Sequence, residues 1–490
     1  MNFIIVLAVF VSASLAAAII SKEKAVRTIS GIAALVGGGA VLALVLPVLS
    51  GASVSWSSQL LLVDRFSALI AALVAIVYMA ATLVSVRYIG HEHHEGIITA
   101  NDVRLYFSLL HLFALTMIVT VLTNNTLLLW IALEGTTLSS TFLVGLYRKK
   151  TSVEAAWKYI IICSTGISLG LIGILLLGYG SRLAGATGID MFLLTSLQHN
   201  APLLSAATVK LAFVFLFIGF GAKVGLAPMH TWLPDAHSKA PSPISGLFSG
   251  ILLNVALYAI MRFAYVANSS LHSGWTSNFF LIFGTASIVL SALMMIVQNN
   301  YKRMLAYSSI EHMGLISFAL GLSPLGAIAA VIHMVGHTLT KSLLFFGAGE
   351  ILLRWKTTTV DKVKSVFAHD RYTAILFLFG MLAIVAMPPS ALFVSEYAMF
   401  ASALAQYPLL ALLLFISLSV IAYSMLRLVL PMLFGHDDSA PAKTERWNIT
   451  HSVMLVQLVA LFVFAAWVTS VPGLDFVQGV VNDAVYISTK

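Results

Sequence analysis

Long apolar segments separated by short polar connections dominate this chain of 490 residues. A helix needs about 20 mainly apolar residues to cross a bilayer, and about 14 segments meet that requirement. Because lipid cannot hydrogen-bond exposed peptide groups, such segments must form helices. The sequence therefore predicts an all-α polytopic membrane protein with about 14 transmembrane helices. The segments lie near residues 2–20, 29–49, 60–86, 106–122, 126–147, 155–178, 207–230, 241–266, 276–298, 304–322, 325–353, 372–400, 407–433 and 450–470.

The scarcity of charge supports this prediction. Hydrophobic residues make up 60% of the chain and charged residues only 9%, whereas a soluble domain carries about 25% charged residues. Most of the outer surface must therefore contact the lipid bilayer. The first apolar segment lacks a positively charged start and is followed directly by "SKEKAVR", so we expect a retained helix rather than a cleaved secretory signal.

Positive charges alternate between the connections. One set of alternate connections, together with Arg427, holds 20 of the 27 Lys and Arg residues, a distribution that marks cytoplasmic loops. This alternation predicts that both termini lie on the non-cytoplasmic side of the inner (plasma) membrane. It also explains the net charge of +8, which therefore does not indicate a nucleic-acid partner. The remaining residues are Arg65, Arg182, Lys210, Lys223, Arg262, Lys341 and Lys490.

The composition also limits cofactors. Cys163 is the single cysteine, and one thiol cannot form an internal disulfide or supply the ligand sets of iron–sulfur clusters and structural zinc sites. We therefore expect no cofactor on this chain. No soluble domain or long hydrophilic tail interrupts the apolar pattern, so the sequence predicts one polytopic domain.

Ionisable residues within the apolar segments are the candidates for function. A charged side chain at the middle of a membrane helix costs about 2.5–3.5 kcal/mol on insertion scales and usually marks a transport pathway. Glu134 and Lys223 carry opposite charges, and a close pair in a dry interior would act as a switch because an arriving proton weakens it. The alternative is a pair that only fixes packing. The candidates are Glu134, Lys223, His333, His337, Lys341 and Glu396, with Glu311, His312 and Glu350 nearer helix ends.

Prolines interrupt two of these segments. Pro228, in "GAKVGLAPMHTWLPDAH", removes a backbone donor five residues after Lys223 and frees carbonyl groups nearby. Pro388, in "MPPSALFVSEYAMF", precedes Glu396 by about two turns. Broken membrane helices must face protein or a wet cavity, and they mark ion sites in transporters. One interruption in each half of the chain suggests a duplicated transporter core.

Three ionisable residues share one face of a predicted helix. His333, His337 and Lys341 are spaced i, i+4, i+8 in "HMVGHTLTKSLLFF", a stripe about 12 Å long. Imidazole accepts and donates protons near neutral pH, so the stripe favours a proton relay; a polar seam that holds helices together is the alternative. No carboxylate or cysteine lies beside it at ligand spacing, so we expect no metal site.

Two polar motifs lie in predicted cytoplasmic connections. "HEHHEG", residues 91–96, resembles a metal-binding tract but is expected to be a solvated loop. "PDAHSKAP" contains Asp235, His237 and Lys239. This motif either feeds protons into the membrane or caps helix ends.

Several stretches resemble a known family. "AKVGLAPMHTWLPDAHSKAPSPISGLFSGILLNVALY", "NNYKRMLAYSSIEHMGL" and "HMVGHTLTKSLLFFGAGE" are similar to the antiporter-like subunits of respiratory complex I and of Mrp-type sodium/proton antiporters. The resemblance spans the central 120–400 region. "ALEGTTLSSTFLVGLYR" and "LLNVALYAIMRF" look most like the F subunit of hydrogenase-4 and formate hydrogenlyase-type complexes.

The resemblance implies a fold and an arrangement of sites. The implied fold has two inverted five-helix repeats with the seventh and twelfth helices broken, divided as N-terminal helices in 1–105, a first repeat in 106–270, a second in 271–435 and a C-terminal helix and tail in 436–490. It implies a Glu134–Lys223 pair, an axis through His333, His337 and Lys341, and an exit acid at Glu396. We expect supporting roles for Pro228, His230, Asn254, Glu311, His312 and Pro388.

One position departs from the family. Many relatives in complex I carry a lysine in the eighth helix where this chain has Asn254. Asparagine does not exchange a proton near neutral pH, although it can order water. The middle of the axis, between Lys223 and His337, would then depend on hydrated polar groups.

The leading hypothesis is a proton-translocating subunit of a redox-driven complex, hydrogenase-4-like or NADH:quinone oxidoreductase-like. Other membrane subunits would surround it, and electron-transfer subunits would carry the redox centres. A sodium/proton antiporter subunit, a subunit for proton-coupled uptake of inorganic carbon and a passive scaffold are the alternatives. The companion genes and the dependence of flux on sodium would distinguish them.

Overall fold

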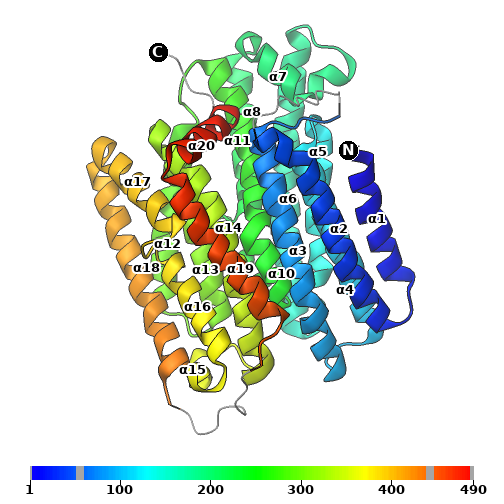
Figure 1. Ribbon diagram of the computed structural model, residues 1–490. Helices are drawn as coiled ribbons and strands as arrows, with labels where there is room; N and C mark the ends of the chain where they lie inside the picture. The colour runs from blue at the N-terminus through cyan, green and yellow to red at the C-terminus, as the bar shows by residue number, and fades with distance from the viewer. Residues whose placement is uncertain (1–2, 51–59, 437–445, 486–490) are drawn as a thin grey trace.

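The computed structural model describes residues 3–50, 60–436 and 446–485, and these ranges are almost entirely helical (Figure 1). The helices are α1 (Phe3–Ile19), α2 (Glu23–Leu49), α3 (Arg65–His94), α4 (Ala100–Leu122), α5 (Thr126–Val144), α6 (Lys150–Leu183), α7 (Leu194–Asn200), α8 (Ala206–Val224), α9 (Trp232–Lys239), α10 (Ser242–Leu247), α11 (Leu253–Leu271), α12 (Ser277–Ile296), α13 (Tyr301–Leu320), α14 (Pro324–Trp355), α15 (Val366–His369), α16 (Arg371–Ile384), α17 (Ala391–Gln406), α18 (Pro408–Phe434), α19 (Ile449–Val468) and α20 (Val471–Ala484). The short turns η1 (Gly188–Phe192), η2 (Ala201–Leu203), η3 (Phe248–Leu252) and η4 (Val360–Lys362) complete the described elements.

Each of the predicted membrane segments corresponds to a helix or to a broken helix. Within the described residues, 11 helices are long and apolar enough to cross a membrane, counting α10, η3 and α11 as one, and α1 and α16 are shorter apolar helices. α13 contains 20 residues and is buried along almost its whole length. The prediction of an all-α polytopic membrane protein is confirmed.

Polar caps set the ends of several helices. The Asp64 and Thr99 side chains accept hydrogen bonds from backbone groups in the first turns of α3 and α4 and form capping boxes there. The Asn125 side chain accepts from the amides of Leu127 and Leu128. These side chains satisfy donors that a helix leaves unpaired at its start. Capping by Asn125 explains why only "TNN" separates α4 from α5.

Two details of the predicted organisation are wrong. "HEHHEG" is not a solvated loop, because α3 continues to His94 and Glu92 is only 5% exposed. The C-terminal part of the chain contains a second helix, α20, where a tail was expected. Residues 437–445, which contain Lys443 of the predicted cytoplasmic set, and Lys490 lie outside the described residues.

The two predicted helix breaks are present. α8 ends at Val224, and Gly225 follows with φ +80°, a conformation that glycine adopts without steric penalty. α16 ends at Ile384, and α17 begins after Pro388 and Pro389. The breaks interrupt the seventh and twelfth predicted segments. Each break therefore lies in the fourth of the five segments of its predicted repeat.

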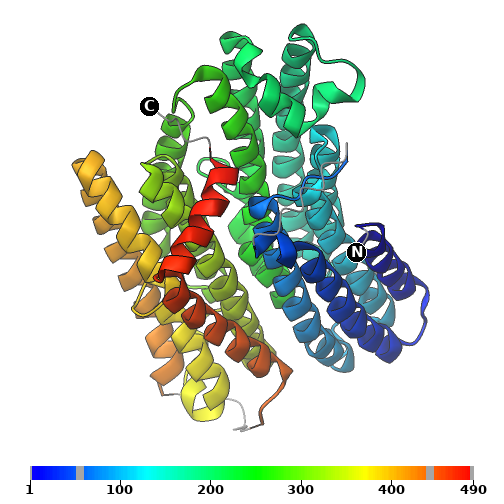
Figure 2. The ribbon, with the colours of Figure 1, turned by 45° about the horizontal axis from the view of Figure 1, so that its top comes forward.

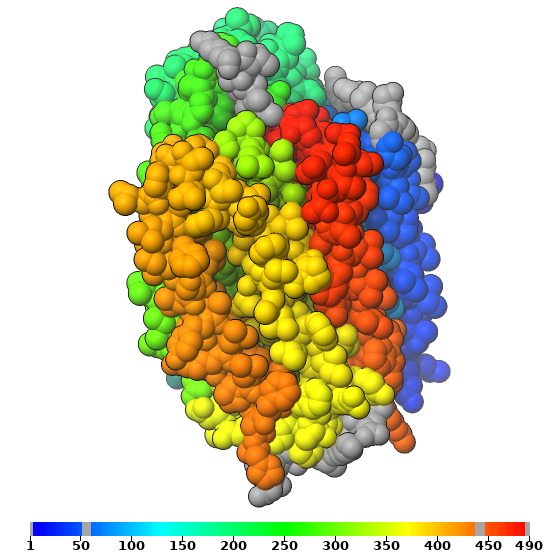
Figure 3. Space-filling model, turned by 60° about the vertical axis from the view of Figure 1, so that its left-hand side comes forward, coloured from blue at the N-terminus to red at the C-terminus, as the bar shows by residue number. Residues whose placement is uncertain are grey.

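The helices pack side by side around a buried centre. α1 begins and α20 ends at the same end of the bundle (Figures 1 and 2). Almost all residues in the most apolar part of α14 are buried inside the bundle, and all of those in the most apolar part of the α10–α11 segment are buried. Figure 3 shows the opposite situation at the surface, where α18, α16 and α19 lie side by side. Exposed side chains of α18 and α19 include Leu409, Phe415 and Val456, as a lipid-facing or subunit-facing surface requires.

Candidate functional site: a buried ionisable pathway

Lys223 occupies the last turn of α8, directly before the first break, and is completely buried. Its Nζ donates to the hydroxyl of Tyr159 at 2.6 Å and to Oγ1 of Thr137 at 2.9 Å. The ammonium also lies 4.7 Å from the centre of the Tyr159 ring. Two hydroxyl oxygens and an aromatic face therefore replace the hydration that the ammonium loses on burial.

Glu134 lies one turn before Thr137 on α5, and its carboxylate contacts a different partner. Ser164 of α6 donates to Oε1 of Glu134 at 2.6 Å. No ion pair within 4.0 Å joins Glu134 to Lys223 in the part of the chain that the structure describes. The prediction of a direct pair is wrong: each charge bonds to hydroxyl groups instead of to the other charge. The two helices, α5 and α8, both pack against α6, which carries Tyr159 and Ser164, so the charges still interact electrostatically.

The first break has most of its backbone groups satisfied by protein. The indole of Trp232 donates to the carbonyl oxygen of Ala222 at 2.8 Å. The amide of Ala227 donates to Oγ of Ser287 at 2.9 Å. His230 lies within the break and is 8% exposed. The break therefore faces protein rather than lipid, as buried irregular backbone must in a membrane.

The middle of the bundle contains Asn254 in place of the family lysine. Its side-chain amide donates to Oγ1 of Thr338 at 2.9 Å and to the carbonyl oxygen of Met334 at 3.3 Å. Immediately before α11, residues Phe248–Leu252 form a π-helical turn. In this turn the Ser249 hydroxyl forms a 2.6 Å hydrogen bond with the Ser309 hydroxyl of α13. Asn254 thus links the eighth segment to α14 through polar groups that do not titrate near neutral pH.

The predicted stripe on α14 is buried. His333, His337 and Lys341 are each 0% exposed, and their i, i+4 spacing places them on one side of the helix. Nζ of Lys341 donates to the carbonyl oxygen of Leu305 at 3.0 Å. Neither ring nitrogen of His337 has a hydrogen-bond partner among the described residues. The stripe faces α13 rather than lipid.

α13 and α17 extend this stripe into a cluster. Nδ1 of His312 lies 2.8 Å from Nε2 of His333, and Nδ1 of His333 lies 2.9 Å from Oγ of Ser395. Nε2 of His312 is 3.4 Å from Oε2 of Glu311. Glu396 lies near both imidazoles, with one ligand atom of each of these three residues within 4.8 Å of the others. The fold therefore places the predicted exit acid, Glu396, beside His312 and His333.

A cavity of about 420 Å³ opens at the end of the bundle where the predicted cytoplasmic loops lie. Glu92, Tyr147 and Lys302 are among its lining residues. The hydroxyl of Tyr147 donates to Oε1 of Glu92 at 2.6 Å. Burial, together with the nearby Tyr88 and Glu92, raises the pKa of the Tyr147 phenol well above its usual range, so Tyr147 remains a donor at neutral pH.

His237 lies inward of this cavity and is completely buried. Its ring stacks on Phe345 of α14 with a centroid distance of 5.1 Å. Asp235, from the same motif, instead pairs with Arg303 at 2.7 Å and Lys158 at 3.1 Å near the surface. The motif therefore places one side chain in the interior and one in a surface ion-pair network.

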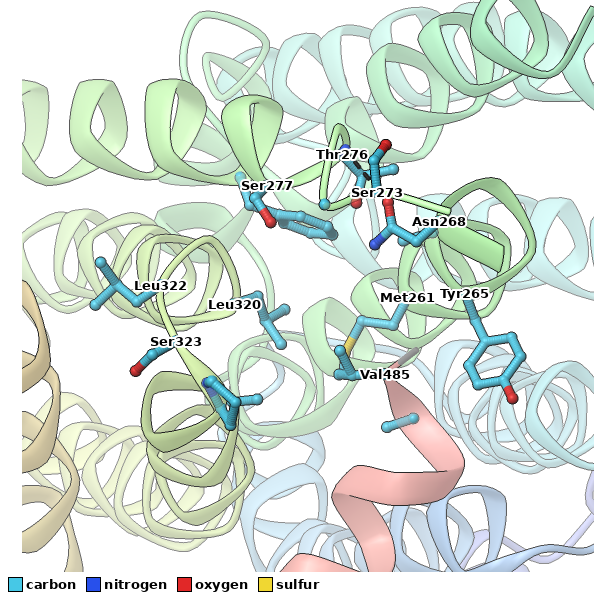
Figure 4. A pocket seen from close by; sticks show the side chains of 16 residues that line it. Met261, Tyr265, Asn268, Ser273, Thr276, Ser277, Leu320, Leu322, Ser323 and Val485 are labelled. Carbon is cyan, nitrogen blue, oxygen red and sulfur yellow. Dashed lines mark hydrogen bonds between the residues drawn. The ribbon is translucent and has the colours of Figure 1, made fainter. Parts of the chain in front are cut away.

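A second cavity, of about 260 Å³, opens at the opposite end of the bundle (Figure 4). Asn268 of α11, Ser277 of α12 and Ser323 of the α13–α14 connection surround it, and Val485 lies beside it after the end of α20. The two cavities thus lie at opposite ends of the bundle.

Tyr159, Ser164 and Glu92 are functional candidates that the sequence analysis missed. Tyr159 and Ser164 lie in a long apolar segment, where a tyrosine or a serine is not unusual. Glu92 lies four residues after Tyr88, and both are buried. That i, i+4 spacing of polar residues at the end of an apolar helix was the available signal.

Comparison with known proteins places this geometry in a family. The family model for "NADH:quinone oxidoreductase/Mrp antiporter, TM" matches residues 123–422. The Hydrogenase-4 component F homolog of Methylacidiphilum infernorum is 37% identical over 405 residues, which cover 82% of this chain and 85% of that protein.

Two solved structures share the fold. A chain of the membrane-bound sulfane sulfur reductase, an archaeal respiratory membrane complex, aligns with a TM-score of 0.86 and 23% identity over 99% of this chain and 98% of that one. A chain of the Mrp complex from Dietzia sp. DQ12-45-1b aligns with a TM-score of 0.83 and 17% identity over 99% and 97%. This chain belongs to the transmembrane family of NADH:quinone oxidoreductase and Mrp antiporter subunits.

Proposed function

We propose that this chain translocates protons across the membrane as one subunit of a redox-driven complex of the hydrogenase-4 or NADH:quinone oxidoreductase type. The observation that carries the proposal is the row of buried ionisable and hydroxyl side chains between two cavities at opposite ends of the bundle. Burying such groups in a membrane protein is costly, and those that are retained usually mark a transport route.

The coupling end is the Glu134–Lys223 region. A change of charge beside Glu134, imposed by a neighbouring subunit, alters the field at Lys223 because the interior screens charge poorly. Thr137 and Tyr159 hold the ammonium in place. When Glu134 loses its charge, the protonated form of Lys223 loses electrostatic support and the proton moves toward Lys341.

The middle of the route depends on hydrogen bonds rather than on a titrating lysine. Asn254 and Thr338 orient water between Lys223 and the α14 stripe. Water bridging polar side chains in this way conducts protons without a charged residue at each step. The Asn254 position therefore separates two titrating clusters.

The exit cluster relays the proton through imidazoles. His337 and His312 have ring centres 5.4 Å apart, and His312 contacts His333 directly. Each neutral imidazole accepts a proton on one nitrogen and releases one from the other. Glu396 then receives the proton at the edge of the bundle. Glu92 and Tyr147 in the cytoplasmic cavity supply the entry side.

Partners supply what this chain lacks in the proposal. Other membrane subunits contact its exposed apolar faces, and electron-transfer subunits carry the redox centres. In the cell the chain lies in the inner (plasma) membrane with both termini non-cytoplasmic, as the alternation of positive charge predicts.

Two substitutions test the proposal in the intact complex. Glu134→Gln and Lys223→Met should abolish proton uptake coupled to electron transfer, while the complex assembles and electron transfer by its partners persists in part. Proton movement is measured with a pH-sensitive dye in inverted vesicles. Wild-type proton pumping in either assembled variant would contradict the assignment.

A sodium/proton antiporter subunit is the second candidate, favoured by the 0.83 TM-score to a chain of the Mrp complex. Proton flux stimulated by sodium in the same vesicles would support it. Flux that is independent of sodium and requires electron transfer supports the redox-driven complex.

A further inference from the structure

We propose that His312, His333 and Glu396 form a binding site for one divalent metal ion of the zinc class. The three residues come from α13, α14 and α17, and one ligand atom of each lies within 4.8 Å of the other two. Two imidazoles and one carboxylate, with a fourth position open, are a common ligand set of zinc. The sequence excluded metal because no ligand lies beside the α14 histidines along the chain; the fold brings them from other helices.

His333 already has the orientation that a ligand needs. The single hydroxyl hydrogen of Ser395 is donated to the carbonyl oxygen of Leu392 at 2.9 Å. Ser395 therefore accepts its 2.9 Å hydrogen bond from Nδ1 of His333. With its hydrogen on Nδ1, His333 directs the lone pair of Nε2 toward His312. Metal-bound histidines are typically held in this way through their other ring nitrogen.

The other ring nitrogen of His312, Nε2, lies near a carboxylate, that of Glu311. Nδ1 of His312 donates to Nε2 of His333 at 2.8 Å. Metal binding requires that this hydrogen move to Nε2 of His312, which lies 3.4 Å from Oε2 of Glu311. Glu311 then accepts it, and both facing nitrogens present lone pairs to the ion. No proton is gained or lost in the exchange.

The spacing and the charge fit a small dication. Tetrahedral bonds of about 2.0–2.1 Å separate two ligand nitrogens by roughly 3.3 Å, so the imidazoles need to part by only about 0.5 Å. Glu311 and Glu396 supply two carboxylates near the ion. The positive charge of Lys341 would repel a dication. Its Nζ, however, donates to the carbonyl oxygen of Leu305 on α13.

The three ligands differ in exposure. Both histidines are completely buried, whereas Glu396 is partly exposed on α17. Glu396 is therefore the ligand nearest the surface of the chain.

Occupancy would interrupt the relay, and this consequence rests on the proposed function. A bound ion takes the two lone pairs through which His312 and His333 pass a proton. The metal thus acts as an inhibitor of translocation, not as a cofactor for it.

Metal binding is tested on the full-length chain within its purified complex, after treatment with a chelator, by equilibrium dialysis against radioactive zinc. Wild type should bind one more zinc per chain than the His312→Gln and Glu396→Gln variants. Ser395→Ala should lower the affinity by about 10- to 100-fold through loss of ligand orientation. X-ray absorption at the zinc edge should report two imidazoles and bond lengths near 2.0 Å.

Controls separate this site from other histidines. His111→Gln removes a buried imidazole that contacts Tyr78 outside the cluster, and zinc binding should be unchanged. Replacing His91, His93 and His94 by glutamine removes the histidines at the end of α3 and should also leave it unchanged. Equal zinc binding by wild type and both ligand variants, or loss of binding only in the α3 variant, would overturn the proposal.

The flux assay distinguishes the two proposals. Zinc binding at the cluster with proton pumping unaffected would support the metal site and contradict the imidazole relay. Inhibition by zinc that persists in the ligand variants would instead contradict the metal site and leave the relay in place.

Discussion

Nζ of Lys223 lies 2.6 Å from the hydroxyl of Tyr159, whereas the Glu134 carboxylate accepts from Ser164. The acid and the amine that would switch proton movement therefore bond to neutral hydroxyl groups rather than to each other. The hydroxyl oxygens replace part of the hydration that the buried ammonium loses. The hydrogen bond from Lys223 also makes Tyr159 a direct determinant of where the Lys223 proton is held.

Tyr159→Phe should lower coupled proton flux by about tenfold. The substitution removes a hydrogen bond to a charged group, worth about 1.5–3 kcal/mol, and leaves the aromatic contact in place. Flux is measured in vesicles and normalised to assembled complex. Ser168→Ala is the matched control, because the Ser168 hydroxyl only donates to the carbonyl oxygen of Ser164 on an exposed face. Unchanged flux in the Tyr159 variant would mean that the Tyr159 hydroxyl has no part in coupling.

Asn254→Leu should abolish flux, and Asn254→Ser should retain part of it. Leucine is similar in size but cannot bond to Thr338 or orient water, whereas serine can do both. Assembly should be retained for both variants and is checked by co-purification of partner subunits. Equal flux in the two variants would contradict a hydrated route past this residue.

Glu92→Gln should reduce flux several-fold, because it removes a proton-accepting group from the cavity that Glu92 lines while preserving the hydrogen bond from Tyr147. Glu95→Gln is the control. Glu95 pairs with Lys356 at 2.9 Å on the exposed rim, and such surface pairs contribute about 0–1 kcal/mol. If both variants pump equally, protons enter elsewhere.

Asp64→Asn should destabilise the protein by about 3–5 kcal/mol without acting on the proton route. Asp64 pairs at 2.6 Å with Arg262, which is completely buried, and the substitution leaves that guanidinium without its counter-charge. Thermal unfolding in detergent measures the effect. A transition temperature equal to that of wild type would contradict a structural role for the pair.

The Asp64–Arg262 pair also makes the stability of the protein depend on pH. Burial acts to raise the pKa of Asp64, but the charge of Arg262 and the hydrogen bonds from Arg262 and Ser67 outweigh it and lower the pKa. The stabilisation is therefore present above the ordinary carboxyl pKa and is lost as pH falls through the lowered value. The difference in stability between wild type and Asp64→Asn should narrow over that acidic range.

The amino-acid sequence was sufficient for the helical segments, the two breaks and the identity of most buried ionisable residues. The bilayer makes these features local: about 20 apolar residues form a spanning helix wherever they occur, and a proline or a charge within them is costly at that position. The positions of Pro228, Lys223 and His337 could therefore be interpreted without knowing their neighbours.

The contacts between helices were decided only by the tertiary structure. A helix that is apolar on every side does not specify which face meets which neighbour. The spacing of residues along the sequence therefore could not predict that Lys223 contacts Tyr159 or that His312 lies near Glu396. Burial of Glu92 was missed for the same reason, because its cover comes from Tyr147, 55 residues away. Rotation and register of packed helices set these distances, and both depend on the whole bundle.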